Sequence, residues 1–76
     1  MKEILEIMIK NLVENPEAVS IEEVQKEKET VLKVTLDAKD MGRVIGKQGR
    51  MAKSIRTVIK AIAVKQNQKV IVEFVD

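Results

Sequence analysis

The stretch VIGKQGRMAKSI, residues 44–55, constrains the fold more than any other part of the chain. Gly46 and Gly49 stand three residues apart in it, between an apolar pair and a run with helical spacing. A glycine permits positive φ and lets another backbone come close, because it has no Cβ. The pattern therefore predicts a tight turn over these four residues, with a helix on either side.

The two predicted helices differ in length and in the character of their faces. The first is short, can be capped by Asp40 and runs through Ile45. The second runs from Arg50 to about Lys65, and Gln66-Asn67-Gln68 ends it. At about 100° per residue, one arc of the long helix is apolar and predicted to be core: Met51, Ala52, Ile55, Val58, Ile59, Ile62 and Ala63. The opposite arc carries Arg50, Lys53, Arg56 and Lys60.

The rest of the chain predicts one more helix and three strands. An amphipathic helix opens the chain, and Asn15-Pro16 is expected to end it, because a residue before proline leaves the helical region. Ile21 and Val24 are out of phase in the first strand, which allows a bulge there. The strands are expected at residues 19–26, 32–36 and 70–75. The order α-β-β-α-α-β predicts a single α+β domain over residues 1–76, with three helices on one face of a three-stranded sheet.

Charge is distributed very unevenly along the chain. Residues 1–40 hold six lysines and ten carboxylates, a net charge of −4. Residues 41–76 hold eight Lys or Arg and two carboxylates, a net charge of +6, and no acid occurs from Met41 to Val72. So basic a half indicates an anionic partner, nucleic acid above all, although a basic face can also serve solubility alone.

The predicted turn and the basic helix after it form a plausible place for phosphates. A helix N-terminus offers unpaired N–H groups and the positive end of a dipole. The turn adds bare glycine backbone and Lys47, and the helix adds its basic arc. The simpler interpretation is a structural turn in which glycine only permits the bend.

The sequence lacks the residue types and motifs on which most enzyme active sites depend. The chain has no histidine and no cysteine, and its hydroxyl residues have no base nearby in sequence. Gly42 and Gly46 are one residue too close for a nucleotide-binding P-loop, and Gln48 stands where that motif needs a hydroxyl. We therefore expect no catalysis, no cofactor and no metal site, whose commonest ligands are missing.

The neighbours of the glycines give a more specific indication. The run of two apolar residues, G-K-Q-G and a helix, placed between strands, resembles the KH domain, whose G-x-x-G loop clamps about four single-stranded nucleotides. The expected element order is similar to the prokaryotic, type II version. The block DMGRVIGKQGRMAKSIRTVIKA, the opening helix with Asn-Pro and the closing VIVEFVD resemble the small bacterial single-KH family, KhpA, over essentially the whole chain.

The resemblance implies roles for particular residues. Gly46, Lys47, Gln48 and Gly49 match the family loop and would hold the nucleic-acid backbone. Ile45 would help to floor the groove for bases, although core packing is an equal alternative. The basic residues of the next helix that would neutralise phosphates are Arg50, Lys53 and Arg56.

The resemblance also implies partners. Since Phe74 is the only aromatic residue and stacking is worth roughly 1–3 kcal/mol per base, one domain should bind single-stranded RNA weakly and gain from a second copy. The family forms homodimers, pairs with a larger KH protein (KhpB, or Jag), and is associated with post-transcriptional control or RNA chaperoning and with cell elongation and division. Ala61 and Val64 lie off the core arc and could form a seam between subunits.

Other functions and surroundings stay open from sequence. The chain could bind single-stranded DNA, use helix–turn–helix contacts to duplex DNA, or only assemble with partners. The absence of cysteine favours a reducing cytoplasm, and residues 1–13 resemble neither a signal peptide nor a membrane span.

Overall fold

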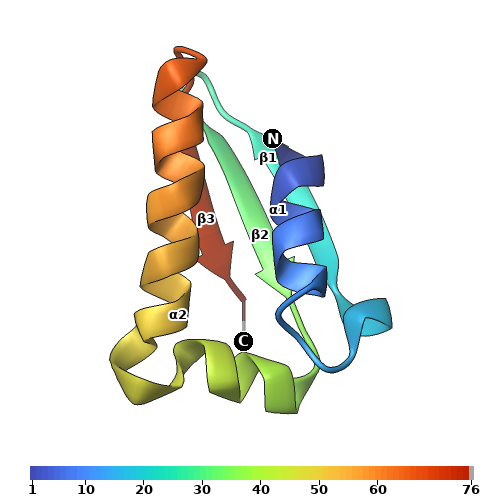
Figure 1. Ribbon diagram of the computed structural model, residues 1–76. Coiled ribbons are helices and arrows are strands. Elements are labelled where there is room, and N and C mark those ends of the chain that lie inside the picture. The colour runs from blue at the N-terminus through green and yellow to red at the C-terminus, as the bar shows by residue number, and fades with distance from the viewer. Residues whose placement is uncertain (76) are drawn as a thin grey trace.

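The computed structural model describes residues 1–75 as two helices, a short 3-10 helix and three strands. They follow one another along the chain as α1 (Lys2–Lys10), η1 (Pro16–Ala18), β1 (Ser20–Gln25), β2 (Thr30–Thr35), α2 (Ala38–Lys65) and β3 (Val70–Phe74). The sheet has the order β1-β2-β3, and α1 and α2 cover one of its faces (Figure 1). The predicted α+β class and the three-stranded sheet are confirmed.

The hydrophobic core lies between the sheet and the helices that cover it. β1 pairs antiparallel with β2, and β3 pairs parallel with β2. Leu32 and Val34 of the central strand are fully buried against Leu5 and Ile9 of α1 and the inner side of α2. Burying an aliphatic side chain contributes roughly 1.5–3 kcal/mol, so this central row dominates the stability of the small domain.

The outer face of the sheet explains the phase change that the sequence shows in β1. Ser20–Gln25 pairs with Thr30–Thr35 residue by residue, so the expected bulge is absent from β1. Val24 instead lies on the outer face beside Val31, which also pairs with Ile71 of β3. This row buries Val31 to 3 % exposure on the side away from the helices. Ile21 is out of phase with Val24 because the two side chains belong to opposite faces.

Helix α1 ends earlier than the sequence predicts. Asn11 caps it, with both its backbone N–H and its side-chain Nδ2 donating to the carbonyl of Ile7, the latter at 2.7 Å. Asn15-Pro16 does not end α1. It starts η1, where proline at the first position needs no hydrogen-bond partner for its nitrogen.

The start of α2 is also capped differently from the prediction. Asp37 is the N-cap, and its carboxylate accepts a hydrogen bond from the Lys39 N–H at 3.2 Å. Asp40 was expected in that role, but it is the third residue of α2, within the first turn, and is 1 % exposed. Its carboxylate faces the chain after α1 instead of the end of its own helix.

Helix α2 is broken in the middle. Gly46, Lys47, Gln48 and Gly49 have non-helical φ and ψ, so α2 consists of an N-terminal arm, residues 38–45, and a C-terminal arm, residues 50–65. The arms run in clearly different directions (Figure 1). The two helices expected here are therefore one element with a break at the predicted turn.

The core-facing arc of the C-terminal arm is narrower than expected. Its fully buried members are Ala52, Ile55, Ile59 and Ala63. Met51 and Ile62 are half-buried, and Val58, which the sequence places in the core, is 44 % exposed. Val58 lies at the margin of the arc, where α1 does not reach across to cover it. Among residues 1–75, no helix is long and apolar enough to span a bilayer.

Candidate nucleic-acid interface

The four residues of the loop combine one extended residue with three left-handed ones. Gly46 has φ −63° and ψ 173°, and Lys47, Gln48 and Gly49 have φ of 53°, 64° and 69°. A left-handed conformation costs a residue with a side chain roughly 1–2 kcal/mol. Two such residues in succession store strain at the surface, which is typical of sites where a backbone must present itself to a ligand.

The backbone conformation requires glycine at one of the two loop positions and not at the other. Gly49 needs its freedom because its φ is positive. Gly46 does not, since its φ and ψ suit any residue. A Cβ built at Gly46 would also meet no atom of the protein within 4 Å. Neither backbone conformation nor packing therefore explains the missing side chain at residue 46, and open space is left beside the loop.

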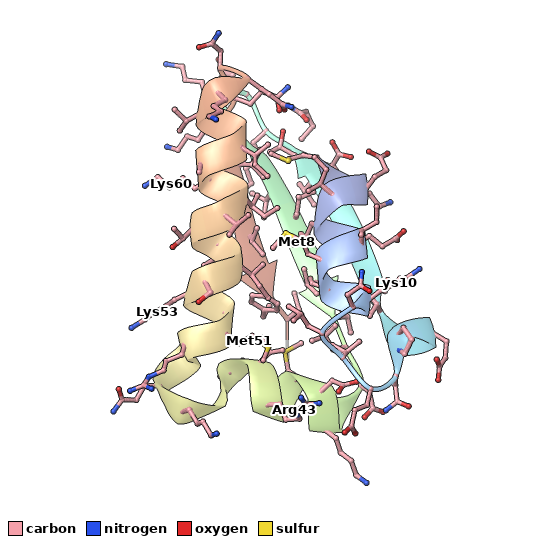
Figure 2. All side chains as sticks on the ribbon, viewed as in Figure 1. Met8, Lys10, Arg43, Met51, Lys53 and Lys60 are labelled. Atoms are coloured by element: carbon pink, nitrogen blue, oxygen red, sulfur yellow. The ribbon has the colours of Figure 1, made fainter. Side chains whose placement is uncertain are left out.

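Positive charge surrounds this open backbone. Lys47, Arg50 and Lys53 are all exposed, and Lys53 points away from the sheet (Figure 2). The C-terminal arm starts anew at Arg50, so the positive end of its dipole lies at the loop. The structure thus brings Lys47, Gln48 and Arg50 together at one corner, and Lys53 lies one turn further along the helix.

Arg56 differs from the other basic residues because two contacts hold it. Its Nε donates to the carbonyl oxygen of Val72 at 3.1 Å. Its guanidinium carbon lies over the ring of Phe74, 5.5 Å from the centroid. The side chain remains exposed, yet it is fastened to β3 instead of extending freely into solvent.

Ile45 precedes the loop and is 43 % exposed, whereas its neighbour Val44 is buried in the core. Core packing therefore accounts for Val44 and not for Ile45. An exposed apolar residue beside the loop is available to the base of a bound nucleotide.

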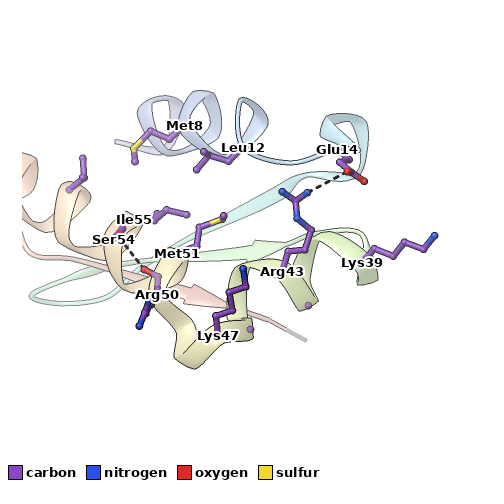
Figure 3. Close-up of a pocket in the computed structure, with 13 residues that line it drawn as sticks. Met8, Leu12, Glu14, Lys39, Arg43, Lys47, Arg50, Met51, Ser54 and Ile55 are labelled. Atoms are coloured by element: carbon purple, nitrogen blue, oxygen red, sulfur yellow. Dashed lines mark hydrogen bonds and ion pairs between the residues drawn. The ribbon is translucent and has the colours of Figure 1, made fainter.

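A groove of about 920 Å³ opens between α1 and α2. We call it the α1–α2 groove. Met8 and Leu12 project from the α1 side toward Met51 of α2 (Figure 3). Ile55 and Val58 continue the apolar lining. Of the residues predicted to bind nucleic acid, this groove contains Gly46, Lys47 and Arg50, whereas Ile45, Gln48, Gly49, Lys53 and Arg56 do not line it.

Two basic residues on the rim of this groove escaped the sequence analysis. Lys39 and Arg43 precede Lys47 at intervals of four residues, so they extend the basic row along the N-terminal arm. A spacing of four predicts that these residues share one face of a helix, but the sequence analysis assigned only a cap to this short arm and not its charged face. Arg43 is partly engaged, because its Nη1 lies 3.8 Å from Glu14 and 3.6 Å from Asp40 (Figure 3 shows the contact with Glu14).

Asp40 anchors the N-terminal arm, and thereby the loop, to the segment after α1. Its two carboxylate oxygens accept hydrogen bonds from the backbone N–H groups of Glu14 and Asn15, each at 3.0 Å. The hydrogen bond from Glu14, followed by that from Asn15 and the charge of Arg43, lowers the pKa of Asp40 although burial opposes the shift. The role of the Asp40 side chain is structural, because it links the two segments by hydrogen bonds and takes no part in proton transfer.

A second, smaller groove of about 310 Å³ lies on the other side of α2, against β3. We call it the α2–β3 groove. Its cations are Arg56, Lys60 and Lys69, and its apolar residues are Ala63, Val64, Val70, Ile71 and Val72. Lys69 was missed because the sequence analysis considered the helix alone, and its Nζ pairs with Glu29 at 3.6 Å.

The described residues, 1–75, contain no cluster of three or more His, Cys, Asp or Glu side chains arranged to hold a metal ion. The site offers groups for non-covalent binding, namely exposed backbone, cations and apolar surface. Such a set can hold a phosphate backbone and bases without making or breaking bonds.

Comparison with known proteins places this geometry in a family. The family described as KhpA/KhpB, KH domain, matches residues 2–74. A Clostridium perfringens protein named RNA-binding protein KhpA is 53 % identical over 99 % of this chain and 100 % of its own length. Proteins of the same name from Clostridium acetobutylicum, 52 % identical over 99 % of this chain and all of their own, and Aquifex aeolicus, 38 % identical over 100 % and 96 %, are similar over their length as well.

No solved structure matches this one. The family's curated members are named for RNA binding, which agrees with the expectation that the chain is not an enzyme. The match over nearly the whole chain, together with full-length relatives far above chance identity, shows that this chain belongs to the KhpA/KhpB KH-domain family.

Proposed function

We propose that this protein binds single-stranded RNA without catalysis, and that the loop over residues 46–49 clamps the RNA backbone. The observation that carries the proposal is the open space at Gly46, where neither φ nor packing calls for glycine. A phosphate backbone can approach there because no Cβ intervenes. The names of the relatives, all RNA-binding proteins, support RNA as the ligand.

Each residue around the loop takes a distinct part. Lys47 and Gln48 are exposed on left-handed backbone and would contact the phosphates that lie against Gly46 and Gly49. Arg50 and Lys53 continue the positive charge along α2, and Ile45 offers apolar surface to a base. Arg56 adds positive charge to the same helix.

We also propose that residues 1–76 form one KH domain of the type II order, in which the two arms of α2 count as the second and third helices. The break at residues 46–49 supports this assignment, because the arms differ in direction on either side of it (Figure 1). β2 and β3 are parallel neighbours in the sheet, and α2, which contains the loop, connects them.

A second copy of the chain is the partner that the α1–α2 groove fits best. Leu12 and Val58 leave apolar surface exposed there, at 42 % and 44 %. In a twofold contact the α1 side of one copy meets the α2 side of the other. Glu14 would then face the basic rim of the partner at Lys39. We propose a homodimer on this basis, with a larger KH protein as an alternative partner.

The proposed setting is the cytoplasm, where such a dimer would act as a post-transcriptional regulator or RNA chaperone. The lack of cysteine and the family of RNA-binding relatives support this setting. The exposed apolar groove also favours a second candidate function, a module that assembles with partners and binds little RNA itself.

Titration of a fluorescently labelled single-stranded RNA with the protein, followed by anisotropy over a series of salt concentrations, tests the proposal. If the loop clamps about four nucleotides, log affinity should fall with log salt with a slope of about −3, since each neutralised phosphate on a single strand contributes about −0.7. A DNA oligomer of the same sequence tests whether the 2′-hydroxyl matters. The absence of binding by the folded protein would favour the assembly module.

A further inference from the structure

Arg56 is the one basic residue of the C-terminal arm whose guanidinium plane is fixed from two sides. The 3.1 Å hydrogen bond from Nε to the carbonyl oxygen of Val72 sets its position. The guanidinium carbon lies over the ring of Phe74, 5.5 Å from the centroid, which is within cation–π range. Phe74 is half-buried and Arg56 is exposed, and from these two observations we infer that the side of the guanidinium away from Phe74 is accessible to a ligand.

The surroundings of this plane suit a nucleobase. Arg56 lines the α2–β3 groove, where Ile71 and Val64 offer apolar surface and no acidic residue among residues 1–75 takes part in the lining. Ile71 is 36 % exposed and Val64 is 63 % exposed, so both are accessible to a ligand. Lys60, one turn beyond Arg56, places a cation beside the same groove.

The position along the helix also suits a strand held at the loop. Arg56 follows Gly49 by seven residues, which is about 10 Å along an α-helix at 1.5 Å per residue. Lys53 lies between them and points outward, so it can meet the phosphates on the way (Figure 2). A strand clamped at residues 46–49 and running along the C-terminal arm therefore reaches Arg56 within the few nucleotides that a KH loop holds.

The bound state of Nε decides how Arg56 can act. A guanidinium grips a phosphate best through two parallel N–H groups. The pair that includes Nε is unavailable because Nε already donates to Val72, so only the Nη1 and Nη2 pair remains for a phosphate. Its plane remains available for stacking. Bases of single-stranded RNA stack on arginine planes as they do on aromatic rings, and the chain has no Trp or Tyr and only one Phe to serve instead.

We propose that Arg56, held by Val72 and Phe74, is a stacking platform for a base of the RNA strand that the loop clamps. The inference rests on the proposed RNA binding and adds a specific residue to it. Phe74 acts through Arg56 as its support, and the Val72 carbonyl fixes the plane. The contact is with the π-face of the base, so it is tolerant of base identity.

The test compares Arg56→Lys with the wild-type protein on two oligomers, one ordinary single-stranded RNA and one of the same length in which every base is absent. Lysine keeps the charge but has no plane. We expect Arg56→Lys to weaken binding of the ordinary RNA by about fivefold or more, as loss of one stacked base does. Binding of the abasic oligomer and the slope against salt should remain unchanged.

Lys53→Ala is the matched control, one turn earlier on the same helix. It should weaken both oligomers alike and reduce the salt slope by about 0.7, because it removes a phosphate contact. A second measurement uses the wild-type protein alone: the NMR signal of the Arg56 Nε–H should shift with the ordinary RNA and stay in place with the abasic oligomer, since only a base has a ring current.

Equal weakening of both oligomers by Arg56→Lys, or of neither, would overturn the stacking role while leaving the RNA clamp in place. So would an Arg56 signal that moves equally with both oligomers. Failure of the folded wild-type protein to bind ordinary RNA would instead remove the proposed function, and the platform with it.

Discussion

Gly46 is a glycine that the fold does not require, and we propose that the RNA backbone is the reason for it. Its backbone would accept any residue, and a methyl group there would touch no part of the protein. Gly49, three residues later, has a positive φ that a side chain would strain. The same substitution should therefore have opposite consequences at the two positions.

We predict that Gly46→Ala leaves stability within about 0.5 kcal/mol of the wild type, as for most surface changes, but weakens RNA binding by about tenfold, or 1.4 kcal/mol. The new methyl group would occupy the space of the phosphate backbone. Gly49→Ala should instead lower the free energy of unfolding by about 1–2 kcal/mol, because its residue is left-handed. Chemical denaturation and RNA anisotropy measure the two effects, and unchanged affinity for Gly46→Ala would refute the clamp at that glycine.

Asp40 is the residue that links pH to stability. Its pKa is lowered in the folded protein, chiefly by the hydrogen bond from the Glu14 N–H. A lowered pKa means that the carboxylate contributes stability above its ordinary value of 3.8, and that this contribution is lost as the pH falls through the folded value. Asp40→Asn should therefore be less stable than the wild type at pH 7.

The difference in melting temperature between wild type and Asp40→Asn should shrink as the pH is lowered from 7 to below about 4. Thermal unfolding followed by circular dichroism at both pH values measures it. Asp37→Asn serves as a comparison, because Asp37 caps α2 at its exposed end. A difference that stays constant with pH would mean that the Asp40 carboxylate does not hold the segment after α1.

At the scale of the element, the break in α2 is the feature that sets the site. The sequence predicted its position correctly, because two glycines three apart and the change of periodicity are both local signals. It could not reveal that Lys47 and Gln48 are left-handed, since neither residue type favours that conformation. The rest of the fold therefore imposes the left-handed backbone on Lys47 and Gln48 against their own conformational preference.

Gln48→Gly should relieve part of this strain. A left-handed residue with a side chain costs roughly 1–2 kcal/mol, and glycine loses about 0.5–1 kcal/mol in chain entropy, so we expect a net gain of up to about 1 kcal/mol. Gln68→Gly, at a residue without positive φ, should lose stability by a similar amount. Denaturant unfolding gives the free energy of unfolding of both variants. A lower value for Gln48→Gly than for the wild type would show that the loop is not strained there.

Other elements show where sequence reasoning stops. Asp40 was predicted as the cap of α2, but its carboxylate accepts from the N–H groups of Glu14 and Asn15, 26 and 25 residues away, and Asp37 caps the helix instead. Val58 fits the core arc by its spacing, but its exposure depends on how far α1 lies from α2. The tie between Arg56 and Val72 joins residues 16 positions apart. In each case the deciding contact is between distant parts of the chain.

At the scale of the whole molecule, the C-terminal arm of α2 separates two grooves with different chemistry. The α1–α2 groove is broad and apolar at its floor, and we assign it to a second copy. The α2–β3 groove is smaller and lies on the far side of the same helix. On these proposals, the apolar lining of the α1–α2 groove serves assembly, whereas Gly46, Lys47 and Arg50 on the same groove, together with the α2–β3 groove, serve RNA.

Leu12→Glu should disrupt the dimer without unfolding the domain. Leu12 is 42 % exposed and lines the α1–α2 groove, so a carboxylate there costs little in one copy but would be buried against the other. Ile7→Glu, at 62 % exposure on α1 and outside the groove lining, is the matched control and should leave the dimer intact. Light scattering measures both masses, and a dimeric Leu12→Glu would place the contact elsewhere.

The central claim is that the loop over residues 46–49 holds RNA, and the double variant Lys47→Asp/Gln48→Asp tests it most directly. Both side chains are exposed, and aspartate tolerates left-handed backbone, so the fold should survive. Lys28→Asp/Asn67→Asp makes the same change of charge on exposed residues at the opposite end of the domain, and Asn67 is left-handed like Gln48.

RNA anisotropy with the wild type and both double variants, each shown to be folded by circular dichroism, is the measurement. The account predicts that Lys47→Asp/Gln48→Asp abolishes binding at concentrations where the wild type saturates, while Lys28→Asp/Asn67→Asp retains it with only a small loss. Equal binding by the two double variants, or unfolding of the loop variant alone, would contradict the account, because the loop would then be a structural turn and not the RNA clamp.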